Sequence, residues 1–109
     1  MFAYSPSMSV QGDRIVVAWA GAQTAHAWPF ESDPSDIYYA TSKDGGKTWS
    51  KPLQVTDRAK DGITSGGAQV ALQNGVIHLF YAQGKWNNNA QVNQQGGWPV
   101  YYQQRPFPE

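Results

Sequence analysis

Residues 42–49 read Ser-Lys-Asp-Gly-Gly-Lys-Thr-Trp, and the interpretation of the whole chain starts from this octapeptide. It follows the pattern S-x-D-x-G-x-T-W and is flanked by two alternating stretches, residues 36–41 and 52–56. Alternation with a period of two indicates strands, and Asp-Gly-Gly allows positive φ angles between them at little cost. The octapeptide therefore predicts a turn that joins two antiparallel strands.

The side chains of the octapeptide are suited to hold this turn together. The carboxylate of Asp44 can accept hydrogen bonds from nearby backbone amides, and the hydroxyls of Ser42 and Thr48 can close the same loop. Trp49 is then expected to fold back and bury its ring between strands. Two plainer interpretations are an ordinary surface hairpin and a calcium-binding loop, although one carboxylate and a few hydroxyls are too few ligands for calcium.

The octapeptide resembles the Asp-box, or BNR repeat, of the sialidase-type β-propellers. All five defining positions match, and they are Ser42, Asp44, Gly46, Thr48 and Trp49. The resemblance implies an all-β chain made of four-stranded antiparallel propeller blades. In that family the Asp-box lies on the face away from the active site, so the motif indicates architecture and not activity.

The composition narrows the classes of partner. The 109 residues include eight basic and eight acidic side chains and no cysteine. Zero net charge argues against a nucleic-acid partner or a polybasic membrane patch, and the lack of cysteine excludes a disulfide framework. The sequence indicates no metal site, cofactor, signal peptide or membrane-spanning segment, and it favours no particular cellular compartment. Eleven glycines, seven prolines and 14% aromatic residues are typical of short strands and turns, and no helix is predicted.

The chain contains an internal repeat with an offset of 62 residues. Residues 5–20 match residues 67–82, with Val10 aligned on Leu72, and Gln-Gly-Asp and Gln-Asn-Gly form the turn in the two copies. Further on, residues 37–39 match residues 100–102 at an offset of 63. The repeat predicts two blades, the first at about residues 5–57 and the second at about residues 66–109.

The second blade is expected to be incomplete. Strands are predicted at about residues 7–10, 14–20, 36–41 and 52–56 in the first blade, and at about 69–72, 76–82 and 99–103 in the second. Where a second Asp-box would stand, the chain reads Arg-Pro-Phe-Pro-Glu at 105–109, and its two prolines are not expected to continue a ladder. This blade therefore lacks a predicted fourth strand.

Apolar residues occupy both faces of the predicted strand at 14–20. Ile15, Val17 and Trp19 point one way, and Val16, Ala18 and Ala20 point the other. Such strands are covered on both sides, and exposed patches of this kind mark interfaces. We expect either a piece of a longer propeller or a chain that associates with itself. Sialidase-like propellers have six blades, so a cyclic homotrimer is the favoured assembly and a two-fold dimer is the next option.

The candidate ligand site lies on the long loops at residues 21–35, 57–66 and 83–98. In sialidase-like propellers these loops fall on the ligand-binding face, and here they combine aromatic rings with amides and charges, as sugar binding requires. The candidate residues are Trp28, Arg58, Lys60, Asp61, Trp86, Asn88 and Trp98. In a closed ring three copies of Arg58 would converge, so an acidic ligand or paired carboxylates are expected there. Alternatively, the aromatic residues pack as small loop cores or against a neighbouring subunit, and Arg58 pairs with Asp57 or Asp61 on the surface.

Catalysis is not indicated. An active sialidase requires an arginine cluster, a tyrosine nucleophile with a glutamate partner, and an aspartate acid/base. The chain has three arginines and lacks the Arg-Ile-Pro motif of the family, so no catalytic residue is assigned. A non-catalytic, lectin-like carbohydrate-binding module is favoured. The alternatives are a sialidase-like glycoside hydrolase, as a fragment or with a site built from several copies, and a structural or interaction domain.

Overall fold

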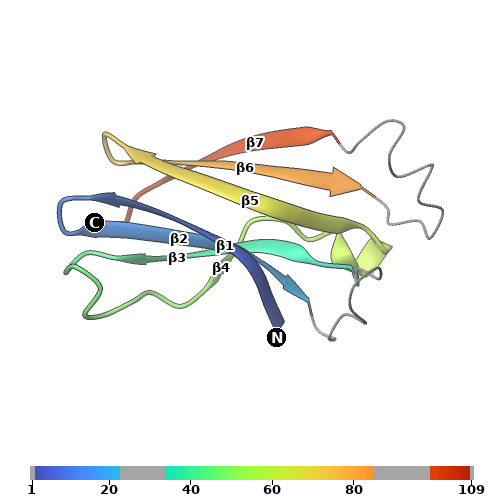
Figure 1. The fold of residues 1–109 in the computed structure, drawn as a ribbon, viewed down its shortest axis with the longest axis horizontal. Coiled ribbons are helices and arrows are strands. Elements are labelled where there is room, and N and C mark those ends of the chain that lie inside the picture. The colour runs from blue at the N-terminus through green and yellow to red at the C-terminus, as the bar shows by residue number, and fades with distance from the viewer. Residues whose placement is uncertain (1, 23–33, 85–98, 109) are drawn as a thin grey trace.

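The computed structural model describes residues 2–22, 34–84 and 99–108, and their regular structure is almost entirely strand (Figure 1). The strands form two antiparallel sheets in which chain neighbours are also neighbours in space. Sheet 1 consists of β1 (Phe2–Gln11), β2 (Arg14–Ala22), β3 (Asp36–Ser42) and β4 (Leu53–Gln54). Sheet 2 consists of β5 (Thr64–Gln73), β6 (Val76–Gly84) and β7 (Val100–Pro106). The prediction of an all-β chain is confirmed.

The two sheets repeat each other residue by residue. Val10 lies opposite Ile15 in sheet 1, and Leu72 lies opposite Ile77 in sheet 2. Both ladders are interrupted at the same place, between residues 4 and 7 in β1 and between residues 66 and 69 in β5. The outer hairpins agree too, since Ala20 pairs with Ile37 and Ala82 with Val100. The sequence repeat is therefore also a repeat of structure.

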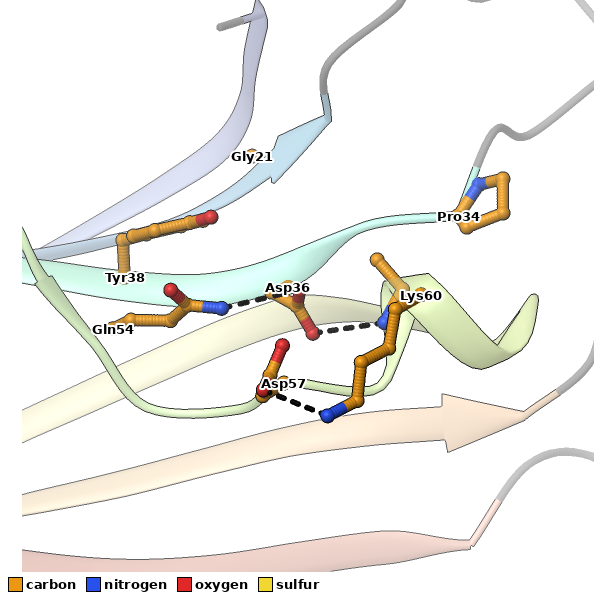
Figure 2. A pocket seen from close by; sticks show the side chains of 8 residues that line it. Gly21, Pro34, Asp36, Tyr38, Gln54, Asp57 and Lys60 are labelled. Carbon is orange, nitrogen blue, oxygen red and sulfur yellow. Dashed lines mark hydrogen bonds and ion pairs between the residues drawn. The ribbon is translucent and has the colours of Figure 1, made fainter.

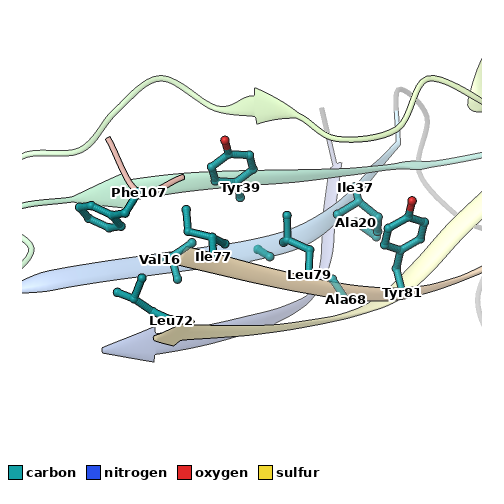
Figure 3. Packing of buried hydrophobic residues seen from close by; sticks show 11 residues of the cluster. Val16, Ala20, Ile37, Tyr39, Ala68, Leu72, Ile77, Leu79, Tyr81 and Phe107 are labelled. Carbon is teal, nitrogen blue, oxygen red and sulfur yellow. The ribbon is translucent and has the colours of Figure 1, made fainter. Parts of the chain in front are cut away.

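The sheets pack face to face over one apolar core (Figure 3). We call the two buried faces the inner faces and the opposite ones the outer faces. The inner face of sheet 1 supplies Val16, Ala18 and Ile37, and that of sheet 2 supplies Ile77 and Leu79. Strands β1 and β5 lie side by side, and the hydroxyls of Ser7 and Ser9 accept hydrogen bonds from the backbone amides of Val70 and Leu72 at 3.2 and 2.9 Å. These bonds satisfy amides of β5 that point away from its partner β6.

The end of the chain differs from the expectation that its prolines would not continue a ladder. Strand β7 runs to Pro106, which lies opposite Val76. Because β7 is an edge strand, the position of Pro106 needs no donor toward a further strand. Phe107 then turns inward, where its amide binds the carbonyl of Gly75 at 2.9 Å and its ring is buried in the core. No fourth strand of sheet 2 occurs in the described part of the chain.

Two local features of sheet 1 also differ from prediction. Strand β4 is only two residues long, because Thr56 bonds to β3 through its side chain, with the amide of Ile37 donating to Oγ1 at 3.0 Å. A single 3-10 turn, η1 (Ala59–Asp61), follows where no helix was expected. No helix in the described ranges is long and apolar enough to cross a membrane.

Candidate functional site

A recess of about 460 Å³ lies on the outer face of sheet 1, beside η1 (Figure 2). Partners in an antiparallel ladder share a face, so Asp36 and its partner Gly21 lie on the same side as Tyr38 and its partner Gln54. The segment after β4 completes the rim. The lining residues are Gly21, Pro34, Asp36, Tyr38, Gln54, Asp57, Ala59 and Lys60.

Asp36 joins the start of β3 to the segment that leads into η1. Its side chain is buried, and its Oδ1 accepts hydrogen bonds from Thr56 Oγ1 at 2.7 Å and from the amides of Arg58 and Ala59 at 2.8 and 3.2 Å. Its Oδ2 receives one longer contact, from Gln54 Nε2 at 3.4 Å. One carboxylate oxygen of Asp36 therefore fixes the rim, and the other is less fully engaged.

Tyr38 supplies an aromatic wall of the recess. Its ring stacks on that of Trp19, with 6.2 Å between centroids and 17° between planes. Burial raises the pKa of the Tyr38 phenol, and the negative charges of Asp36 and Asp57 raise it further. The raised pKa keeps the phenol protonated at neutral pH, so that it can both donate and accept a hydrogen bond.

The charges at the rim are already paired. Lys60 Nζ lies 3.0 Å from Asp57 Oδ2, and this hydrogen bond, with the charge of Asp57, raises the pKa of Lys60. Arg58 Nε lies 3.3 Å from Asp61 Oδ2, with both side chains about half exposed. The surface pairing of Arg58 with Asp61, considered from sequence as the plainer alternative, is thus present. Among the described lining residues there are two carboxylates and one ammonium, which together contribute a net negative charge.

The predicted ligand residues are only partly placed. Of the loop charges, Lys60 lines the recess, whereas Arg58 and Asp61 lie on the same turn outside its lining. Trp28, Trp86, Asn88 and Trp98 lie outside the described residues. Sequence reasoning missed Asp36, Tyr38 and Gln54, which it placed in strands. The sequence feature that could have identified this site is Asp36, a polar residue at the loop end of the strand at 36–41, because alternation places Tyr38 on the same face.

The octapeptide turn lies at the opposite end of the sheets from η1 (Figure 1). Asp44 Oδ1 accepts hydrogen bonds from the amide of Thr48 at 2.9 Å and from Ser42 Oγ at 2.8 Å, while Thr48 Oγ1 donates to Oδ2. These bonds, those of Thr48 foremost, lower the pKa of Asp44 to about 2. Ser42 Oγ in turn accepts the amide of Gly46 at 2.9 Å. The prediction that Asp44 accepts backbone amides is confirmed.

The expectation that Trp49 is buried is wrong, because this side chain is 45% exposed. Its Nε1 donates to the carbonyl of Gly46 at 3.0 Å, which holds the ring over its own turn and not between strands. One edge borders a hollow of about 370 Å³ that Pro108 also lines. Trp49 therefore stabilises the turn locally and does not enter the core between the sheets.

No protein-family model and no curated protein matches this sequence. Among residues 2–22, 34–84 and 99–108, no group of three or more histidine, cysteine, aspartate or glutamate side chains could hold a metal ion. The described lining of the recess at Tyr38 offers an aromatic ring, carboxylate and amide oxygens, and an ammonium group within a single hollow.

Proposed function

We propose that this chain is a sialidase-type β-propeller module without catalytic activity, and that it binds carbohydrate in the recess at Tyr38. One observation carries the proposal: the recess combines an aromatic wall with hydrogen-bonding groups of both kinds, at the end of the sheets where ligand loops were expected. Its volume of about 460 Å³ is within the usual range for small-molecule sites.

The chemistry of the recess matches that of a sugar. A pyranose has apolar C–H faces, which pack on aromatic rings, and a rim of hydroxyls that both donate and accept hydrogen bonds. The carboxylates of Asp36 and Asp57 accept, the ammonium of Lys60 donates, and the Gln54 amide does both. Because the described lining residues carry a net negative charge, the recess is expected to favour neutral sugars over sialylated ones, whose carboxylate would be repelled.

The propeller architecture is supported by the form of the two sheets. Each is an up-and-down antiparallel meander, both have the same register and the same irregularity, and they pack face to face as neighbouring blades do. The turn at 42–49 adds the bonds of Asp44 and Ser42 expected of an Asp-box. The half-exposed Trp49 departs from that expectation.

The hydrolase alternative is less well supported. No arginine lines the recess, and the raised pKa of Tyr38 opposes formation of the phenolate that a tyrosine nucleophile requires. The third candidate, a structural domain, predicts that the recess has no small ligand. A binding experiment separates it from the proposal.

The test is a glycan array with neutral and sialylated oligosaccharides, followed by titration calorimetry on the best ligand. We expect neutral glycans to bind, and Asp57→Ala and Lys60→Ala each to weaken binding by about tenfold through the loss of one hydrogen bond. Arg58→Ala is the matched control, because Arg58 follows Asp57 in the chain but does not line the recess. It should leave the affinity for the glycan unchanged. Failure to bind any glycan, or a glycan affinity in all three variants equal to that of the wild type, would favour the structural domain. Release of free sugar would favour the hydrolase.

A further inference from the structure

Both outer faces of this two-sheet structure expose large apolar side chains. On sheet 1 they include Val10, which is 54% exposed, and on sheet 2 they include Phe80 and Val100. Among the described strand residues, the outer face of sheet 2 carries no Lys, Arg, Asp or Glu. Depletion of charge over an apolar surface is typical of the centre of a protein interface.

The internal repeat relates each exposed outer face to a buried inner face. Val10 and Leu72 are equivalent, 62 residues apart, but Val10 is exposed, whereas Leu72 is 8% exposed and lies in the core. The stacked rings of Trp19 and Tyr38 on the outer face of sheet 1 are likewise equivalent to the stacked rings of Tyr81 and Tyr101 in sheet 2. The outer face of sheet 1 therefore has the form of the inner face of sheet 2.

That second stack shows what such a face packs against. The rings of Tyr81 and Tyr101 on the inner face of sheet 2 lie 5.9 Å apart with 17° between planes, against 6.2 Å and 17° for Trp19 and Tyr38. Tyr81 is buried within the core that the two inner faces share, whereas Tyr101 beside it is 43% exposed. The Trp19 stack has the same geometry, and within residues 2–22, 34–84 and 99–108 no second sheet packs over it.

The same relation holds in the other direction. Val100 is equivalent to Ile37, because Val100 pairs with Ala82 in its ladder as Ile37 pairs with Ala20. Val100 is 72% exposed, whereas Ile37 is fully buried. Phe80 is equivalent to Ala18, which is also fully buried. The outer face of sheet 2 therefore has the form of the inner face of sheet 1.

We infer that the outer face of sheet 2 in one copy packs on the outer face of sheet 1 in the next copy, as the two inner faces pack within the chain. The occupant is a second copy because the chain carries both complementary halves of this contact, and no strand of the described residues packs over either. The contact is head-to-tail, so it propagates and closes into a ring when the rotation permits. Three copies would place six sheets in that ring, the number expected from the resemblance to sialidase-type propellers.

The neighbouring copy also contributes to the recess. Within the chain, Ala20 and Ile37 lie in the same core cluster as Tyr81. At the intermolecular contact their equivalents, Ala82 and Val100, would lie against Trp19, the equivalent of Tyr81, beside Tyr38 of the recess. The recess of one copy thus gains an apolar wall from the next. This consequence rests on the proposed function of the recess, whereas the contact itself rests on the repeat.

Two single substitutions test the contact. Val10→Asp places a charge on the outer face of sheet 1, and Val100→Asp places one on the outer face of sheet 2. Both positions are solvent-exposed in one copy, so each variant should fold, with the far-ultraviolet circular dichroism of the wild type. By light scattering at micromolar concentration, the wild type should have about three times the 12.0 kDa mass of one chain, and each variant should be a monomer.

Mixing the variants identifies the pairing. The Val10→Asp chain keeps an intact outer face on sheet 2, and the Val100→Asp chain keeps one on sheet 1, so an equimolar mixture should form a dimer of one copy of each. A contact between two like faces would instead leave one variant associated on its own and give no mixed dimer. Arg58→Ala, which lies outside both faces, should associate like the wild type.

The inference is overturned by a wild type that stays monomeric, by two variants that both associate like the wild type, or by a mixture without mixed dimers. Glycan binding is scored separately on the same samples. A monomeric wild type that binds neutral glycans would refute the contact and leave the proposed function in place. A ring that binds no glycan would support the contact and refute the proposed function.

Discussion

Asp36→Ala is expected to destabilise the chain strongly, because one buried carboxylate oxygen serves three donors. The substitution removes the acceptor for Thr56 Oγ1 at 2.7 Å and for the amides of Arg58 and Ala59 at 2.8 and 3.2 Å. Asp36 is 4% exposed, and Thr56 is buried as well. The substitution therefore leaves donors without a partner where Asp36 excluded water.

The magnitude follows from these contacts. A buried group left without its partner costs roughly 1–3 kcal/mol. Thr56 is expected to incur the full penalty, while the two amides lie beside the open recess and recover part of theirs from water. We expect a loss of about 3 kcal/mol in the free energy of unfolding, a large part of the ~5–15 kcal/mol typical of a domain.

Urea unfolding followed by tryptophan fluorescence measures this loss, at one fixed protein concentration because association would add to apparent stability. Asp36→Asn keeps the shape and one acceptor oxygen, so it should lose about half as much free energy as Asp36→Ala. Asp57→Ala removes a carboxylate from an exposed ion pair on the same rim and should scarcely move the midpoint. Equal midpoints for Asp36→Ala and the wild type would show that Asp36 does not hold the rim.

Two further predictions concern the turn at 42–49. Gly46→Ala should cost about 1–2 kcal/mol of unfolding free energy in the same urea assay, because φ at Gly46 is +95°. Gly66→Ala is the control and should cost far less, because Gly66 has no positive φ and no atom lies within 4 Å of a new Cβ there. Equal effects of the two substitutions would contradict the conformational argument. Asp44 has a pKa of about 2 in the folded chain, below its unfolded value, so the stability that its carboxylate adds is complete above about pH 4 and is lost as pH falls through about 2. The stability difference between wild type and Asp44→Asn should therefore shrink over this range, and a constant difference would rule out the hydrogen-bond network as its source.

Local sequence determined the strands and turns of this protein. Period-two alternation, Asn-Gly at 74–75 and Asp-Gly-Gly at 44–46 located the hairpins, because strand patterning and turn conformation depend on residues within a few positions of each other. The repeat of 62 residues also explains why the two hairpins share one register, since equal strands joined by equal turns pair in the same way. The bonds of Asp44 are local in the same way, as they link residues two and four positions apart.

Tertiary structure alone decided which of these residues meet across the molecule. Asp36 accepts a hydrogen bond from the amide of Arg58, 22 residues later, and together with Tyr38 and Gln54 it lines a recess that strand alternation alone does not build. Phe107 enters the core, whereas Trp49, the larger ring, stays half exposed over its own turn. Burial depends on whether a second layer passes above a side chain, and that is set by the packing of the two sheets and not by the residue type. The same reason separates Val10 from Leu72: equivalent in sequence and in register, they differ because only Leu72 has a sheet packed over it within the chain.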